Sequence, residues 1–187
     1  RGMIAMHQID PDQLTAEVML PLLDADHKPL RLAALKIVRQ HPDWSRQALP
    51  SLAKWLATEA SLQSRNDVAR GLLTGFLSDP SFQELVGKKL NENASSTWLL
   101  ETIASVQSLP LAVSWQKPIE QLLISKDSAT LALGISVVQA IKTNHFNEQL
   151  TRLASASGTP AILKVAALSA ASGNSSQLKD PAFQVLT

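Results

Sequence analysis

Pairs of apolar stretches with the spacing of amphipathic helices recur along the chain, and this repetition constrains the fold more than any other feature. Apolar side chains three and four positions apart form one stripe per helix, as from Leu30 to Val38. The first helices of successive pairs begin near residues 29, 66, 97, 129 and 160, at spacings of roughly 31–37 residues. No stretch alternates as a strand would. Because two helices cannot bury their apolar faces alone, the sequence predicts an all-α fold in which about five helical hairpins stack as a right-handed superhelix, a solenoid.

The second helices of these pairs are expected at residues 13–23, 43–58, 81–92, 112–125 and 146–156. Pro21, Pro50 and Pro118 each lie inside one of these stretches, at intervals of roughly one or two repeats. A proline inside a helix bends it, so we interpret the three prolines as one shared bend. Pro29 and Asp127 lie at expected helix starts, where both residue types favour the first turn.

The composition excludes several kinds of site. The 187 residues suffice for one domain, which we expect to span residues 1–187. The 17 basic and 16 acidic residues leave a net charge of +1, which gives no case for nucleic acid as a partner. The chain has no cysteine, so disulfides, thiolate metal sites and a cysteine nucleophile are excluded. No apolar stretch reaches the roughly 18 residues of a spanning helix, so no membrane insertion is expected.

Motifs that bind cofactors or metals are also missing from the sequence. The four histidines are not spaced as metal ligands, and neither a phosphate loop nor a dinucleotide fingerprint occurs. We therefore expect no catalytic residue, no metal, no cofactor and no small-molecule substrate. Gly71 and Gly75, four positions apart on one expected helix, suggest instead a small-residue face for close helix contact.

Residues 24–35 resemble the start of a HEAT-type repeat. In that family a turn with Asp and Pro is followed by an apolar residue, an Arg and an alanine-rich first helix. Arg31 takes the family's Arg position, and Asp24 or Asp26 takes its turn acid. The later units keep apolar and small residues but lack the Arg. The resemblance implies a HEAT- or armadillo-like solenoid that acts as a scaffold for protein–protein contacts.

Residues 3–8 and 20–26 are similar to the HEAT-like segment of large bacterial multidomain proteins of the planctomycete type. In those proteins a propeller resembling sugar dehydrogenases precedes the segment and a cytochrome c domain follows it. The chain opens on Arg1, and we expect residues 2–8 to be the tail of a preceding helix. It stops inside another expected helix at residues 183–187, so we expect it to be a piece of a longer protein. The resemblance implies a spacer in an oxidoreductase, in a periplasmic or extracytoplasmic location. The residues alone do not set the compartment.

Five residues are candidates for contact with a partner protein: Trp44, Trp55, Trp115, Arg31 and Arg39. The second helices of a solenoid line its concave surface, and we expect Trp44 and Trp55 to project half exposed at the margin of one of them. Tryptophan is enriched among the anchors of interfaces, although packing between repeats is the alternative. The two arginines belong to a basic group that forms either a solvated outer face or a contact with an acidic partner.

The sequence thus predicts a non-catalytic scaffold whose partner is another protein or the flanking domains of its own parent chain. One alternative is the spacer module described above, with the catalytic propeller and the haem domain outside this segment. Another is a catalytic solenoid of the lyase type, which would need convergent acids or histidines. The residue spacing offers no such pair.

Overall fold

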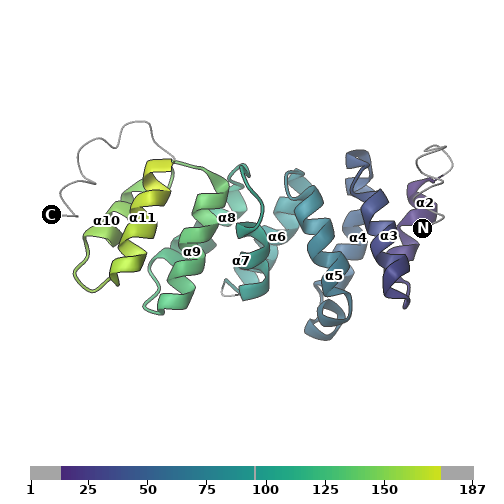
Figure 1. Ribbon diagram of the computed structural model, residues 1–187, viewed down its shortest axis with the longest axis horizontal. Helices are drawn as coiled ribbons and strands as arrows, with labels where there is room; N and C mark the ends of the chain where they lie inside the picture. The colour runs from purple at the N-terminus through teal and green to yellow at the C-terminus, as the bar shows by residue number, and fades with distance from the viewer. Residues whose placement is uncertain (1–13, 95, 174–187) are drawn as a thin grey trace. The chain divides into compact units, whose positions relative to one another are not determined.

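The computed structural model describes residues 14–94 and 96–173, and all regular structure within these ranges is helical (Figure 1). The predicted all-α class is therefore confirmed for this part of the chain. The elements in chain order are α2 (Ala16–Met19), the 3-10 helix η2 (Pro21–Asp24), α3 (Lys28–Val38), the 3-10 helix η3 (Pro42–Trp44), α4 (Ser45–Trp55), α5 (Glu59–Phe76), α6 (Pro80–Glu92), α7 (Thr97–Ala104), α8 (Val113–Leu123), α9 (Ser128–Ile141), α10 (Asn147–Ser155) and α11 (Ala161–Gly173). The helical ends expected near residues 2–8 and 183–187 lie outside the described residues.

The odd-numbered helices from α3 to α11 are the predicted first helices, and the even-numbered helices are the second ones. Only α5 begins much earlier than predicted, at Glu59 instead of near residue 66. Arg65 interrupts α5 with a non-helical φ of −127°, so the apolar part of the helix starts where the periodicity indicates.

The three prolines in the second helices do not play one common role. Pro50 lies inside α4 and Pro118 inside α8, as expected. Pro21 instead begins η2, directly after α2 has ended. The amide of Leu23 there bonds the carbonyl of Leu20, three residues back, which is the tighter 3-10 pattern. The expected continuous helix at residues 13–23 is therefore broken in two within its described part.

The chain divides into two compact units, unit 1 (residues 1–85) and unit 2 (residues 86–187), and each is described by itself. In unit 1, α2 and η2 pack against α3, α4 packs against α5, and α3 packs against α5. In unit 2, α7 packs against α9 and α9 against α11, while α8 contacts both α9 and α10. Within each unit, odd helices therefore contact the next odd helix along the chain.

The helices that pair as hairpins differ from those that the sequence predicts. The sequence pairs each first helix with the second helix that follows it, whereas in the structure α4, α8 and α10 each pack most extensively against the odd helix that comes after them, α5, α9 and α11 respectively. Gly134 shows one cause in unit 2, because a Cβ at this buried position of α9 would lie 2.9 Å from Cβ of Leu122 on α8. The missing side chain lets α9 approach α8 closely.

Candidate binding site

The three candidate tryptophans are core residues, so the expected half-exposed margin is wrong. Trp55 is 1% exposed, Trp115 is fully buried, and Trp44 is 9% exposed with its ring stacked on His41 at 4.0 Å between centroids. A helical wheel of α4 places Trp55 beside the apolar stripe, but it does not include α5, which packs against α4. The alternative of packing between repeats therefore describes these side chains.

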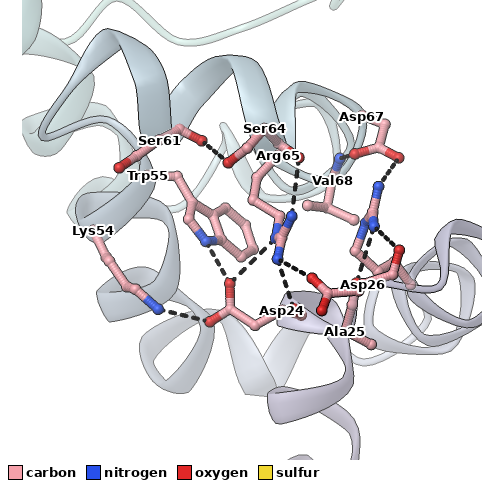
Figure 2. Close-up of polar contacts among 11 residues, drawn as sticks. Asp24, Ala25, Asp26, Lys54, Trp55, Ser61, Ser64, Arg65, Asp67 and Val68 are labelled. Carbon is pink, nitrogen blue, oxygen red and sulfur yellow. Dashed lines mark hydrogen bonds and ion pairs between the residues drawn. The ribbon is translucent and has the colours of Figure 1, made fainter.

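Trp55 belongs to a polar cluster that joins three segments of unit 1 (Figure 2). Its indole Nε1 donates to Oδ1 of Asp24 at 2.8 Å, and Nζ of Lys54 donates to the other carboxylate oxygen at 3.0 Å. Arg65 donates from its guanidinium to the carbonyl of Asp24 at 2.8 Å. Burial raises the pKa of Asp24, but the hydrogen bonds from Lys54 and Trp55 and the charges of Lys54 and Arg65 outweigh it and lower the pKa below its ordinary value. The cluster ties η2 to α4 and α5.

Arg31, a second candidate, is also largely buried and acts within the fold. Its guanidinium donates to the carbonyls of Ala25 and Asp26 at 2.9 and 3.0 Å, and to the carboxylate of Asp67 at 3.1 Å. The side chain is only 9% exposed. Arg31 thus fixes the turn before α3 and links α3 to α5, which corrects its expected place on a solvated or partner-facing surface.

A groove of about 800 Å³ lies between α3 and α5, and it is the candidate binding site. Three contacts with a shared offset of 36 residues set its geometry: Arg31 with Asp67, Leu35 with Gly71, and Arg39 with Gly75. A constant offset means that the two helices run parallel. A Cβ on Gly71 would lie 2.3 Å from Cδ2 of Leu35, so the missing side chain permits the close approach. The predicted small-residue face of Gly71 and Gly75 is confirmed.

The lining of this groove is strongly basic. Its charged side chains are Lys28, Arg31, Arg39, Arg70 and Asp67, four basic and one acidic, which leave a net charge of +3. Lys28 and Arg39 are exposed, and neither makes a hydrogen bond or an ion pair within the described residues. Asp67 is already engaged by Arg31. Of the five sequence candidates, only Arg39 is placed where a partner can reach it.

A second groove, of about 660 Å³, occupies the equivalent position between two consecutive odd helices of unit 2, α7 and α9. Its charged lining consists of Glu101 and Lys142, which cancel. Neither groove was predicted from the sequence, because the tryptophans indicated a site on the second helices. The spacing of Lys28 and Arg39 on one helix, eleven positions apart, is the signal that could have indicated the first.

The described residues also bear on two other classes of site. Among them, no three His, Asp or Glu side chains gather as the ligands of a metal ion would. No described helix combines the length and the apolar character needed to cross a bilayer.

No protein-family model, curated protein or solved structure matches the chain. The likeness to HEAT repeats and to multidomain dehydrogenase-like proteins therefore stays an expectation from the sequence.

Proposed function

We propose that the chain is a non-catalytic helical-repeat scaffold. Its hairpins would stack as a right-handed, HEAT-like superhelix whose surface contacts another protein or the flanking domains of a longer chain. The observation that carries this proposal is the packing of odd helices on odd helices in each unit, α3 on α5 and then α7 on α9 and α9 on α11. Contact limited to neighbouring repeats is the packing of stacked-repeat proteins.

The parallel register of α3 and α5 supports the same proposal. Successive contacts keep one sequence offset, so each turn of α3 meets the equivalent turn of α5. Helices stacked in this way leave an open groove between neighbours, and unit 1 and unit 2 each have one. Stacked repeats use such extended surfaces to bind partners, with a few anchors supplying most of the affinity.

The burial of the tryptophans moves the proposed surface from the even helices to the odd ones. Trp55 and Trp115 cannot anchor a partner without leaving the core. The grooves between the odd helices, in contrast, carry exposed polar and charged side chains such as Gln63 and Gln107. We therefore place the partner contacts on the odd helices.

Site-specific photo-crosslinking in a lysate of the source cells tests the proposal. Benzoylphenylalanine replaces Gln63 in the α3–α5 groove, Gln107 in the α7–α9 groove, or Gln121 on the exposed side of α8 as the control. The proposal predicts one defined protein adduct from Gln63 or Gln107, identified by mass spectrometry, and little from Gln121. Adducts from Gln121 alone, equal adducts from all three positions, or none from any would contradict it.

A further inference from the structure

We propose that the α3–α5 groove binds an acidic segment of a partner protein, in extended conformation, with carboxylates near both ends of the groove. This inference rests on the proposed scaffold function and names the chemistry of its partner. No acidic residue lies between Lys28 and Arg39 along α3, and the one carboxylate of the opposite wall, Asp67, is paired with Arg31. Within the lining of the groove, Lys28 and Arg39 therefore have no carboxylate partner.

The spacing of the two exposed cations sets the length of the segment. Lys28 and Arg39 are eleven positions apart, which at 1.5 Å per helical residue is about 16 Å. An extended chain advances roughly 3.3 Å per residue, so a segment spanning the two cations needs about six residues. A carboxylate near each end of such a segment would meet one cation. Exposed ion pairs of this kind set specificity and the rate of association more than the affinity of one contact.

The middle of the groove suits a backbone better than a bulky side chain. Gly71 and Leu35 both line the groove, and a Cβ on Gly71 would lie 2.3 Å from Cδ2 of Leu35, so there is no room for a larger residue at this position of α5. On the α5 side, the side-chain amide of Gln63 can donate to or accept from the peptide groups of an extended chain. The hydroxyl of Thr74 donates to the carbonyl of Gly71 at 3.2 Å and can still accept a hydrogen bond from a peptide N–H. We therefore expect small residues at the centre of the bound segment.

A protein partner fits this charge pattern better than a nucleic acid does. Nucleic-acid recognition uses a broad basic face, and its affinity grows with the number of phosphates neutralised. Here only four basic residues line the groove, Asp67 interrupts them, and the exposed Asp26 lies close by, beside Arg65 and in the turn that Arg31 holds. The neutral α7–α9 groove shows that the positive charge belongs to this groove and not to every groove of the fold.

The test measures binding of labelled probes to the full chain by fluorescence anisotropy at physiological salt. The probes are a ten-residue glutamate peptide, a ten-residue glutamine peptide and a ten-nucleotide thymidine oligomer. The variants are Lys28→Glu, Arg39→Glu and, as the matched control, Lys36→Glu, which reverses an exposed charge on the same helix outside the groove. Circular dichroism checks that each variant keeps its helix content.

We expect the glutamate peptide to bind and the glutamine peptide not to bind. Lys28→Glu and Arg39→Glu should each raise the Kd about tenfold or more, because each variant replaces an attraction by a repulsion between two carboxylates. Lys36→Glu should change the Kd less than about threefold, because exposed charges outside the contact are screened. The double variant Lys28→Glu/Arg39→Glu should gain affinity for a ten-residue lysine peptide, which a merely destabilised variant would not.

Three results would overturn the inference: no binding of the glutamate peptide, an equal loss from Lys36→Glu, or tighter binding of the thymidine oligomer. The crosslinking experiment separates this failure from that of the scaffold function. An adduct from Gln107 without one from Gln63 keeps the scaffold and contradicts this groove, whereas no adduct at any position contradicts the scaffold itself.

Discussion

Trp55 illustrates what a single side chain contributes to this fold. It fills the space between α4 and its neighbours, 1% exposed, and donates its one polar hydrogen to Asp24. We predict that Trp55→Ala lowers the free energy of unfolding by about 3–5 kcal/mol, the usual cost of removing a large core side chain. Lys54→Ala, at the exposed neighbouring position, removes one exposed ion pair and should cost about 1 kcal/mol or less. Urea denaturation followed by circular dichroism measures both, and equal losses would contradict the burial of Trp55.

Asp24 should make part of the stability depend on pH. Its pKa is lowered in the folded chain, so the unfolded chain binds the proton more readily. The stabilisation is therefore present above the unfolded pKa of about 3.9 and is lost as the pH falls through the lower folded value. Asp24→Asn keeps an acceptor for Trp55 but loses the charge near Lys54 and Arg65.

We predict that Asp24→Asn destabilises the chain at pH 7 and that the difference from the wild type shrinks as the pH falls below about 4. Asp79 also has a lowered pKa, mainly because Ser45 donates a hydrogen bond to it, but it is present in both proteins and cancels in the difference. Urea midpoints at a series of pH values measure the effect. A difference that stays constant from neutral to acid pH would contradict the role given to Asp24.

At the scale of single residues, the sequence singled out side chains that matter for the fold, but it did not predict whether they are buried or which groups they contact. A helical wheel of its own helix places Trp55 at an exposed margin, and membership of a basic group places Arg31 on a solvated or partner-facing surface. Their burial depends on partners far along the chain, Asp24 for the indole and Asp67 for the guanidinium. Neither a helical wheel nor the local charge pattern contains information on such pairs, and the wrong predictions for these two residues share that cause.

At the scale of the elements, periodicity and capping predicted most helices correctly. Asp127 caps α9 by accepting a hydrogen bond from the amide of Thr130 at 2.7 Å, as its position before the helix indicates. Pro29 lies in the first turn of α3, also as expected. The first part of α5 was missed because residues 59–64 carry few apolar side chains, so no stripe marks them.

Two glycines provide a matched test of how closely the helices pack. A Cβ at Gly87 of α6 would lie 2.5 Å from Cβ of Ser114 on α8, an atom that cannot move without the backbone. A Cβ at Gly75 would meet only the side chain of Arg39, at 3.0 Å. Both are helical positions, so alanine brings each the same gain in helix propensity, about 1 kcal/mol.

We predict that Gly87→Ala destabilises the chain by about 1–3 kcal/mol relative to Gly75→Ala, the usual cost of overpacking. Because the propensity gain is shared, the difference isolates the contact between α6 and α8. Thermal melts of the two variants provide the comparison. Equal melting temperatures would mean that the two helices do not approach as closely as described.

At the scale of the whole molecule, the period indicated a repeated two-helix unit, and the packing within each unit of the structure agrees with repetition. Two features could not be predicted from the sequence: which helices pair as hairpins, and where the grooves lie. Both depend on which helix faces meet, and that is decided by small residues such as Gly71 and Gly134 as much as by the apolar stripes. The charge of the α3–α5 groove becomes apparent only when the two helices are placed side by side.

The central proposal is that the hairpins stack in sequence order, and distances between spin labels test it most directly. The chain has no cysteine, so pairs can be introduced without background at the exposed N-terminal ends of odd helices. Lys28 of α3 is the fixed position, paired in turn with Thr97 of α7, Ala129 of α9 and Ala161 of α11. Neighbouring packed helices are about 8–10 Å apart.

Double electron–electron resonance on these three pairs should give distances that increase in sequence order, by roughly 8–10 Å per intervening odd helix. The proposed stack thus predicts that the label on α7 lies nearest to α3, the label on α9 farther away, and the label on α11 farthest. If the chain folds back on itself instead, the α3–α11 distance will be no longer than the α3–α9 distance, and that result would contradict the stacked-hairpin account.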